Sequence, residues 1–486
     1  MPVFLNNIFR NGWAAQAALI VLGVTLLRLG VLALTKADIF VDEAQYWLWG
    51  QTLDFGYYSK PPLIAWVIRA TTDLAGSDSA FWIRFPAPIF HGLTALILGA
   101  WAARAFDSRT ALWTAIGYVT LPITAVGSIM ISTDTIMAPF LAAGLLFYWR
   151  MLATARLSDA LIAGAMIGAA VMAKYAGVYF FIGAGLAAIF VPTCRPTLRN
   201  TLALLAAFAV VIAPNIWWNL AHDLTTVEHT MDNVSWVRGS GEGALLHPLA
   251  LLEFLATQFA VAGPILFAAL LLASRSPDPK LRALVLFALP IIALVSLQAL
   301  LSRAYGNWAF AAYLPGTVAA TAWLASRSPR WLWASLAINA ALALAVPALT
   351  IFGTGLSFQG RPILARYMGR QDLSRQILIL ADETRPAAIV ASDRDVLADL
   401  FLTGQRSPIP IRALPPTGRA MNYYEQTYPL EPSIQGRILF ITNRKRLLCG
   451  AEEVRPLAPF HTEGGAYADK GLRAYLLRPD CYEAMR

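Results

Sequence analysis

Two adjacent carboxylates and a lysine lie close together in an aromatic-rich segment near the N-terminal end of the chain. Asp42 and Glu43 open this segment, and Lys60 follows in the run Gly56-Tyr57-Tyr58-Ser59-Lys60-Pro61-Pro62. A carboxylate can accept a hydroxyl proton, and an ammonium group can stabilise an oxyanion leaving group. The segment therefore offers a base and a phosphate-binding cation. The structural alternative makes Asp42 a helix N-cap and places Glu43 at the positive end of the helix dipole.

Further charged residues lie in or beside long apolar stretches, where ionisable groups are costly and are candidates for function. Asp134 begins one such stretch and is either a functional group or a helix cap. Lys174 either contacts phosphate or extends its ammonium group to the membrane surface. Arg28 lies within the first stretch and needs a carboxylate or a lipid phosphate as its partner. Arg303 is a further candidate for phosphate binding.

Aromatic and polar residues near these charges are candidates for substrate binding. Asn307 and Trp308 follow Arg303, although an aromatic belt at the membrane surface explains the tryptophan equally well. His222 lies in a polar segment that also contains Asp223, His229, Asp232 and Arg238, which suggests a polar lid. The two histidines are seven residues apart and lack the compact spacing of metal ligands, so we expect no resident metal, although a divalent cation could assist the reaction. The remaining candidates for substrate binding are Tyr57 and Tyr58.

The composition indicates a membrane protein. Of the 486 residues, 57% are hydrophobic and only 14% are charged, whereas about 25% of an ordinary soluble domain is charged. This excludes a purely soluble enzyme, and the high hydrophobicity argues against disorder and nucleic-acid-binding tails. The formal net charge of +9 is expected to reside partly in loops that fix membrane orientation.

About eleven apolar stretches have the length of roughly 20 residues that a helix needs to cross a bilayer. They cover residues 13–35, 84–104, 110–130, 134–150, 158–174, 175–192, 200–218, 247–273, 283–301, 305–325 and 331–352. The first is too long, and too poorly marked by a cleavage site, for a removable signal peptide. We expect it to be a retained anchor.

The basic residues between these stretches predict the orientation. If the N-terminus is cytoplasmic, every inside connection is basic, and the opposite loops are acidic or mixed, as the positive-inside rule requires. The inside residues are Arg10, Arg104, Arg109, Arg150, Arg156, Arg195, Arg199, Arg275, Lys280, Arg282, Arg327 and Arg330. The acids predicted outside are Asp38, Asp42, Glu43, Asp54, Asp134, Asp223, Glu228 and Asp232. An odd number of spans then places the C-terminal tail outside.

Residues 353–486 form a polar tail large enough for a small α/β domain. The strand-like runs cover residues 387–391, 438–442 and 472–477, a helical stretch covers 393–403, and residues 409–416 form a proline-rich loop. Cys449 and Cys481 lie in this tail, where an outside compartment permits a disulfide, although two free thiols are equally compatible with the sequence. Cys194 lies in a predicted cytoplasmic loop.

The first outer loop, residues 36–83, also predicts an interfacial helix. At helical spacing, Tyr46, Trp49 and Leu53 share one side, which suggests that their side chains lie at the depth of the lipid headgroups. Asp42 and Glu43 would cap the start of this helix.

Other mechanisms find little support. The sequence has no P-loop, no His-Glu-x-x-His, no paired Cys-x-x-Cys and no Gly-x-Ser-x-Gly motif. A secondary transporter or a lipid flippase is the alternative function, but such folds usually show internal repeats and a binding site at the membrane midplane. A receptor or scaffold would not need Asp42, Lys60 and Asp134.

The motif Asp42-Glu43-Ala-Gln-Tyr46-Trp47, followed by the run that ends in Lys60-Pro61-Pro62, resembles the first outer loop of the protein O-mannosyltransferase superfamily of GT-C glycosyltransferases. The resemblance extends through Asp134, Met172-Ala-Lys174-Tyr175, Trp218-Asn219-Leu-Ala-His222-Asp223 and Asn307-Trp308. Bacterial members include the lipid A aminoarabinose transferases. Two features depart from those enzymes, namely Ser59 in place of an acidic residue and a rather small tail.

The resemblance implies a polytopic α-helical membrane protein of GT-C type, with a catalytic domain at 1–352 and an extracytoplasmic α/β domain at 353–486. It implies transfer of one sugar, with inversion, from a polyprenyl-phosphate carrier to lipid A, another glycan, a glycolipid or a protein. Asp42 matches the loop acid, Lys60 the cation near the donor phosphate and Asp134 the second acid. The implied location is the bacterial inner membrane with a periplasmic site, and no nucleic acid is expected as a partner.

Overall fold

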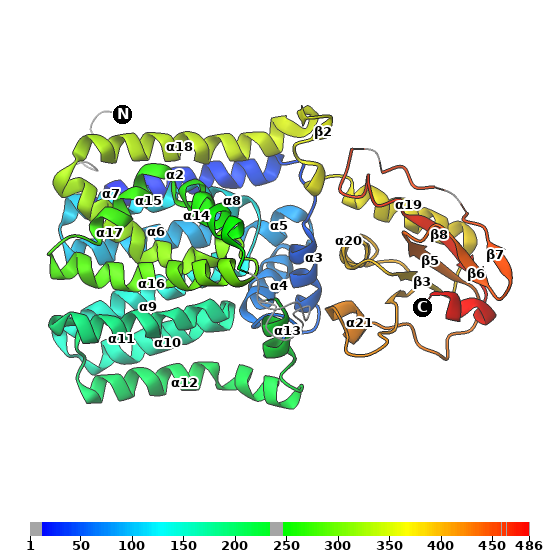
Figure 1. Cartoon of the computed structure of the whole chain (residues 1–486), viewed down its shortest axis with the longest axis horizontal. Coiled ribbons are helices and arrows are strands. Elements are labelled where there is room, and N and C mark those ends of the chain that lie inside the picture. Colours follow the sequence, from blue (N-terminus) through cyan, green and yellow to red (C-terminus); the bar gives the residue numbers. More distant parts are fainter. Residues whose placement is uncertain (1–11, 234–245, 458, 463, 486) are drawn as a thin grey trace. The chain divides into compact units, whose positions relative to one another are not determined.

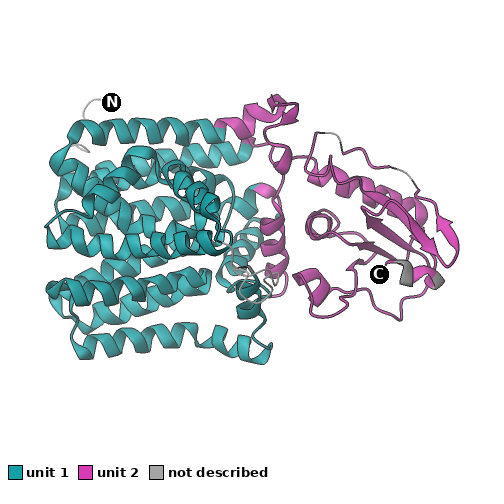
Figure 2. Cartoon of the chain, viewed as in Figure 1, with its two compact units in different colours: residues 1–33, 53–77, 81–347 teal, residues 34–52, 78–80, 348–486 magenta. Residues whose placement is uncertain are grey.

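The structure is a computed structural model that describes residues 12–233, 246–457, 459–462 and 464–485. The chain divides into two compact units, which Figure 2 shows in different colours. Unit 1 comprises residues 1–33, 53–77 and 81–347, and unit 2 comprises residues 34–52, 78–80 and 348–486. Unit 2 therefore joins the C-terminal tail to part of the predicted outer loop. The functional ranges 1–352 and 353–486 stay predictions.

Unit 1 is built from helices that run side by side along a common direction (Figure 1). All eleven apolar stretches predicted from the sequence are helical. The α-helices in these stretches are α2 (Gly12–Leu34), α6 (Pro86–Ala105), α7 (Ser108–Val119), α8 (Pro122–Ile129), α9 (Thr133–Thr154), α10 (Leu157–Ala173), α11 (Tyr179–Phe190), α12 (Leu198–Ala221), α14 (Pro248–Ala262), α15 (Pro264–Ala273), α16 (Pro279–Leu301), α17 (Tyr313–Arg327) and α18 (Pro329–Phe352). Further helices are α4 (Leu63–Ala75), α5 (Ala80–Arg84), α13 (Thr225–Asn233), η1 (Tyr175–Val178), η2 (Pro192–Cys194) and η3 (Gly306–Ala312).

Two of the predicted stretches are broken by proline. Helices α7 and α8 bend by 52° where Pro122 begins α8, and α14 and α15 bend by 107° at Gly263 and Pro264. Proline suits the first turn of a helix, where its missing N–H is not needed, whereas inside a helix it removes a hydrogen bond and its ring clashes with the preceding turn. Gly263 has φ +85°, which a residue with a side chain rarely adopts.

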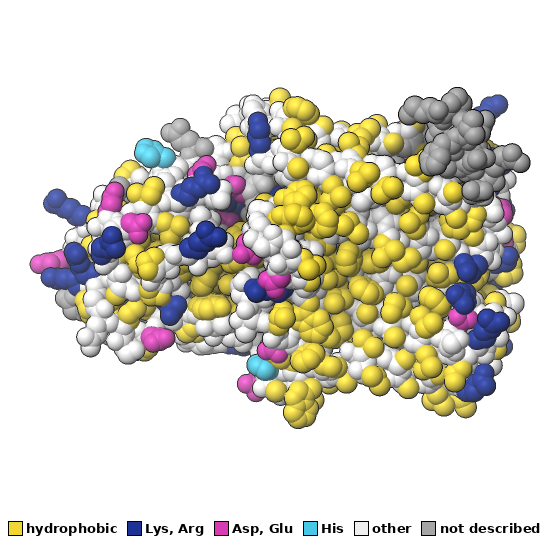
Figure 3. All heavy atoms as spheres, turned by 180° about the vertical axis from the view of Figure 1, so that it is seen from behind, with side chains coloured by type: hydrophobic (Ala, Val, Ile, Leu, Met, Phe, Trp, Pro, Cys, Tyr) yellow, Lys and Arg dark blue, Asp and Glu magenta, His cyan; other side chains and the backbone are white. Residues whose placement is uncertain are grey.

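Within the described residues, six helices are long and apolar enough to cross a membrane, or eight if each bent pair is one span. Two shorter apolar segments, Leu157–Ala173 and Tyr175–Phe190, add to these. Figure 3 shows hydrophobic side chains over much of the visible surface of unit 1, with Lys and Arg side chains gathered at one end. The exact count of about eleven spans stays a prediction.

Two contacts each join a pair of the predicted cytoplasmic connections. The Lys280 ammonium lies 5.8 Å from the centre of the Phe106 ring, which links the connection before α16 to the one after α6. The Arg199 guanidinium donates to the carbonyl of Ala155, 3.1 Å away, and so links the start of α12 to the end of α9. Arg10 lies outside the described residues.

Unit 2 contains a mixed four-stranded sheet in the order β4-β3-β5-β8 (Figure 1). Strand β3 (Ala388–Ala391) pairs in parallel with β4 (Ile411–Ala413) and with β5 (Ile438–Thr442), and β8 (Arg473–Leu477) pairs antiparallel with β5. These strands and α20 (Arg394–Thr403) confirm the predicted strands and helix. Strand β4 lies within the predicted proline-rich loop, and α19 (Arg370–Thr384) and α21 (Tyr423–Thr427) were not predicted.

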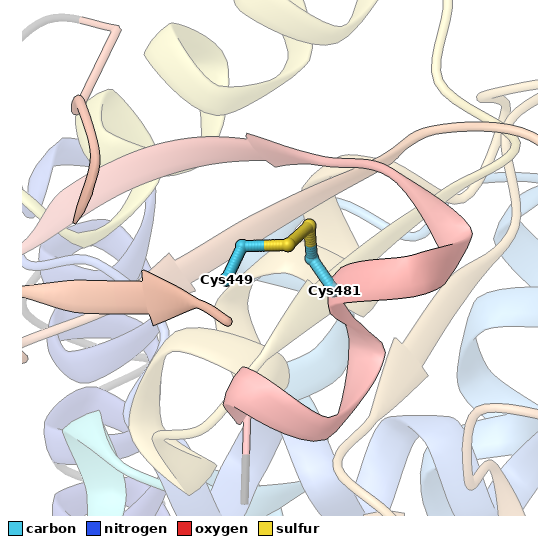
Figure 4. Close-up of a disulfide and its surroundings, with 2 residues drawn as sticks. All are labelled: Cys449 and Cys481. Carbon is cyan, nitrogen blue, oxygen red and sulfur yellow. A yellow bond between two sulfur atoms is a disulfide. The ribbon is translucent and has the colours of Figure 1, made fainter. Parts of the chain in front are cut away.

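Two short hairpins complete the secondary structure of unit 2. Strands β1 (Ser357–Phe358) and β2 (Arg361–Pro362) form one, and β6 (Leu447–Cys449) and β7 (Glu452–Val454) form the other. The core of the unit includes Val390, Phe440 and Tyr475 from the central strands. Cys449 at the end of β6 and Cys481 in η6 (Pro479–Met485) form a disulfide (Figure 4), which decides the question left open by the sequence. Cys194 is a buried free thiol.

Candidate active site

Helix α3 (Val41–Gly50) carries the two adjacent carboxylates, but they play different roles. The N-cap residue is Phe40, and Glu43 caps the helix because its Oε2 accepts the Phe40 N–H at 2.9 Å. Only 1% of Glu43 is exposed, whereas half of the Asp42 side chain is accessible. The alternative in which Asp42 is the N-cap is therefore wrong. Asp42 is left available for another role.

An arginine that the sequence analysis missed contacts Asp42. Arg394, the first residue of α20, donates from Nη2 to Asp42 Oδ1 at 2.6 Å. The same guanidinium donates to Gln45 Oε1, from Nη2 at 2.9 Å and from Nε at 3.1 Å. All three residues belong to unit 2. The pair was not visible in the sequence because 352 residues separate Asp42 from Arg394.

The aromatic residues of α3 pack against other residues of unit 2. Tyr46 and Trp49 are buried, and the Trp49 ring packs edge-on against Tyr423 at 5.8 Å. Leu53 lies beyond the end of the helix and is exposed. Packing within unit 2 therefore buries these aromatic side chains, while their predicted depth at the lipid headgroups stays a prediction.

In unit 1 an ion pair joins two of the predicted site residues. The Lys174 ammonium lies 2.7 Å from each carboxylate oxygen of Asp134, and Asn307 Nδ2 donates to Asp134 Oδ2 at 3.2 Å. Asp134 is buried at the start of α9, Lys174 ends α10, and Asn307 lies in η3. Because Ser132 caps α9 by accepting the Thr135 N–H, the cap alternative for Asp134 is wrong.

The loop that carries Tyr57, Tyr58 and Lys60 is fixed by α12 and α13. Asn215 Nδ2 donates to the carbonyl of Phe55 at 2.7 Å, and Thr226 Oγ1 donates to the carbonyl of Tyr57 at 2.6 Å. Trp218 lies so close to Gly56 that a Cβ there would come within 2.3 Å of its ring. Glycine is therefore required at this contact, and the loop conformation depends on α12.

Tyr175 connects this loop to the ion pair. Its hydroxyl donates to Asn215 Oδ1 at 3.0 Å and accepts from Asn219 Nδ2 at 3.2 Å. Since Tyr175 directly follows Lys174, one short segment contacts both Asp134 and the helix that holds the loop.

The two loop tyrosines are largely buried. Tyr57 accepts the Asp54 N–H on its phenol oxygen at 3.1 Å, and burial raises the pKa of Tyr57 to about 12. The phenol therefore stays protonated at neutral pH. The Tyr58 ring packs against His229, with ring centres 4.8 Å apart.

The other candidates lie near the ends of helices. Arg303 is exposed and its guanidinium lies 4.9 Å from the centre of the Tyr305 ring, which in turn packs against Trp308. The His222 ring stacks on Trp218 at 4.1 Å. The structure thus places His222 beside the residue that contacts the Lys60 loop. Arg238 lies outside the described residues.

Among the described residues, Arg28 donates to a backbone carbonyl and not to a carboxylate. It is buried, and its Nη2 donates at 2.6 Å to the carbonyl of Val119, the last residue of α7. The last carbonyl groups of a helix lack partners within the helix. Arg28 therefore satisfies one of them at the break between α7 and α8. The predicted carboxylate partner is wrong, and a lipid phosphate partner stays a prediction.

No group of three or more His, Cys, Asp and Glu side chains in the described ranges could hold a metal ion. The described groups instead form an Asp42–Arg394 pair in unit 2 and an Asp134–Lys174–Asn307 cluster in unit 1. The pair in unit 2 provides a carboxylate and a guanidinium, and the cluster in unit 1 provides a carboxylate, an ammonium group and an amide; each is suited to an anionic ligand or to proton transfer.

The helical architecture matches that of a solved membrane glycosyltransferase. ArnT from Cupriavidus metallidurans, crystallised with undecaprenyl phosphate, matches with a TM-score of 0.63 at 14% identity, over 94% of this chain and 97% of that chain. The fold is therefore that of a GT-C glycosyltransferase, a polytopic helical membrane protein with a small C-terminal α/β region.

Sequence relatives define the family. A family model for dolichyl-phosphate-mannose-protein mannosyltransferase matches residues 59–218. Lipid A galacturonosyltransferase RgtD of Rhizobium johnstonii is 40% identical over 470 residues, which cover 95% of this chain and 98% of that protein. Lipopolysaccharide core galacturonosyltransferase RgtB of the same organism is 30% identical over 203 residues, or 40% of each chain. The chain therefore belongs to the protein O-mannosyltransferase superfamily of GT-C glycosyltransferases.

Proposed function

We propose that this glycosyltransferase moves a galacturonic acid residue from a polyprenyl-phosphate carrier to lipid A. The observation that carries the proposal is the identity of 40% to a lipid A galacturonosyltransferase over nearly the whole length of both chains. The carrier is supported by the fold that the chain shares with an ArnT crystallised with undecaprenyl phosphate. An acidic residue is expected at the position of Ser59 in aminoarabinose transferases, and the serine found here is consistent with transfer of a different sugar.

The proposed reaction is a single displacement. A lipid A hydroxyl oxygen attacks the anomeric carbon, the bond from that carbon to the phosphate oxygen breaks, and Asp42 takes the hydroxyl proton. The product carries the sugar with inverted configuration, and the leaving group is polyprenyl phosphate. Asp42 suits the role of base because its carboxylate is half accessible, in contrast to Glu43, which caps α3.

Lys60 and Lys174 are proposed to stabilise the phosphate as it leaves, with Arg303 as a further cation. Lys174 uses two N–H groups on Asp134, and its third N–H makes no hydrogen bond to a described residue. Asp134 and Asn307 would hold the ammonium in position for the phosphate. Preorganised positive charge of this kind stabilises a developing anion because it needs no rearrangement during the reaction.

The aromatic and polar candidates are assigned to substrate binding. Tyr57 and Tyr58 shape the loop around Lys60. His222 stacks on Trp218, which contacts this loop at Gly56, and Trp308 packs against Tyr305. Arg28 is assigned no phosphate role in this proposal, because it is buried and donates to a helix carbonyl. A divalent cation is not required by these assignments.

The site is proposed to face the periplasm from the bacterial inner membrane, with the N-terminus cytoplasmic. The basic connections support this orientation through the positive-inside rule. The disulfide between Cys449 and Cys481 supports an oxidising compartment for unit 2, since disulfides persist outside the cytoplasm.

The test uses the purified chain in lipid nanodiscs with synthetic polyprenyl-phosphate galacturonate and lipid A. We expect lipid A to gain one galacturonosyl residue by mass spectrometry, with one polyprenyl phosphate released for each transfer. Asp42→Asn should lower the rate by roughly 100- to 10,000-fold, as expected for loss of a general base. Glu453→Gln, which changes an exposed carboxylate of β7, is the matched control and should retain the rate. Full transfer by Asp42→Asn would exclude the base role.

A lipid flippase or secondary transporter remains the alternative. In proteoliposomes, movement of intact donor across the bilayer without release of polyprenyl phosphate would support it and contradict the proposed transferase activity.

A further inference from the structure

Arg394 lies at a position where the dipole of its own helix disfavours a positive charge. It is the first residue of α20, where the helix dipole disfavours a positive side chain. The two acids beside it do not pair with it. Instead, Lys470 lies 2.6 Å from Asp393 Oδ2 and 3.3 Å from Asp395 Oδ2, and Asp393 also caps α20. Local charge pairing therefore does not explain an arginine at this position.

The Arg394 guanidinium is only partly used by the protein. Nη2 and Nε donate to Asp42 and Gln45, whereas Nη1 makes no hydrogen bond to a described residue. A guanidinium has five N–H donors in a planar fork that matches a carboxylate. Nη1 can therefore donate hydrogen bonds to a second anion while Nη2 continues to donate to Asp42.

The existing ion pair is accessible enough to rearrange. The side chains of Arg394 and Asp42 are 37% and 50% exposed. Ion pairs that are open to water contribute little to stability, because solvent screens them and fixing both side chains costs entropy. An incoming carboxylate can thus share the guanidinium without a large cost.

We propose that Arg394 binds the carboxylate of the uronic acid that is transferred, and so selects a uronosyl donor over a neutral hexosyl donor. This inference rests on the proposed function. A uronosyl group carries a carboxylate that a neutral hexosyl group lacks, and the planar fork of this guanidinium matches a carboxylate. Its link to Asp42 would hold the sugar next to the base that takes the acceptor proton, so that one fork orients both groups.

Donor binding tests the proposal without turnover. The full-length chain in nanodiscs, with no lipid A present, is titrated with polyprenyl-phosphate galacturonate and, separately, with polyprenyl-phosphate galactose. In Arg394→Gln we expect the Kd of the galacturonate donor to rise about 100-fold, which at about 1.4 kcal/mol per factor of ten matches the loss of a charge-assisted contact. The Kd of the galactose donor should change less than about twofold. Arg394→Lys keeps the charge but loses the fork, so its effect on the galacturonate donor should be intermediate.

Arg446→Gln removes an exposed arginine of the same unit and is the matched control. A monodisperse elution profile and an unchanged melting temperature establish that each variant is folded. Equal weakening of both donors, or no weakening of either, would overturn the selectivity role of Arg394.

The outcome is separable from the proposed function. If the unsubstituted chain transfers no galacturonic acid to lipid A, the proposed function fails. If it does transfer galacturonic acid and Arg394→Gln does not distinguish the two donors, only the inference about Arg394 fails.

Discussion

Lys174 donates to both carboxylate oxygens of Asp134, 2.7 Å from each, although 40 residues separate them in the chain. Their side chains are 18% and 8% exposed, so the pair is largely removed from water. A buried charge that loses its partner is strongly destabilising, whereas removal of both charges together costs much less. This pair therefore links the stability of unit 1 to the position of its site residues.

The first prediction concerns this pair. Lys174→Met or Asp134→Asn alone should destabilise the chain, by about 3 kcal/mol for Lys174→Met, because an unpaired buried carboxylate remains. The double variant should be more stable than Lys174→Met. Thermal unfolding in detergent, arranged as a double-mutant cycle, measures the coupling. If the effects of the two single variants simply add, the two side chains do not stabilise each other.

The second prediction concerns Gly56. A Cβ at this position would come within 2.3 Å of Cε3 and 2.6 Å of Cδ2 of Trp218, so Gly56→Ala must displace the ring or the loop. We expect a loss of about 1 to 3 kcal/mol in stability, as for overpacked sites, and weaker binding of the donor because Lys60 lies in the same loop.

Gly30→Ala is the control for Gly56→Ala, because nothing lies within 4 Å of a Cβ at Gly30. Melting temperatures and donor titrations of the two variants are compared. Equal behaviour of both variants would show that the loop does not depend on its contact with Trp218.

The third prediction is a pH dependence of stability. Asp399 is buried beside Arg370, 3.4 Å away, and accepts a hydrogen bond from the Tyr467 hydroxyl. Burial raises the pKa of Asp399 from its ordinary 3.8 to about 7, despite the opposing effect of Arg370, and burial also raises the pKa of nearby Asp38. Between pH 3.8 and about pH 7, Asp399 is protonated in the folded state and ionised in the unfolded state. Stability should therefore fall as the pH rises from 3.8 to about 7.

Asp399→Asn replaces the titrating group with a neutral one and should make this pH dependence shallower, with Asp38 leaving a residual slope. Melting temperatures of the full chain and the variant, recorded from about pH 5 to about pH 7.5, test the difference. The same slope in both proteins would rule out Asp399 as its source.

The fourth prediction concerns the disulfide. Cys449 and Cys481 are 32 residues apart, and a crosslink closing a loop of that length is expected to stabilise by about 3 to 4 kcal/mol. Cys449→Ser with Cys481→Ser should lower the melting temperature, while Cys194→Ser should affect it through a different, local packing change. Before reduction, a thiol-specific mass tag on the denatured chain should label one cysteine, and after reduction three. Three labels without reductant would contradict the bond.

The sequence by itself determined the membrane architecture. A helix needs roughly 20 apolar residues to cross the hydrocarbon core of a bilayer, so such stretches can be read directly from the sequence. All eleven of them are helical. The strands and α20 of unit 2 followed from local patterns of apolar and turn residues in the same way. Asp42, Lys60 and Asp134 could be chosen as candidates because charges are rare in this chain and because the segments that contain them resemble those of a known family.

Only the tertiary structure decided which charges meet. Glu43 and Asp42 are neighbours in sequence, yet one caps a helix and the other contacts an arginine 352 residues away. The partner of Asp134 likewise comes from another helix. Periodicity and composition depend on neighbours along the chain, whereas an ion pair depends on distance in space. The sequence could therefore predict the elements and the candidate residues, but not the contact between Asp42 and Arg394.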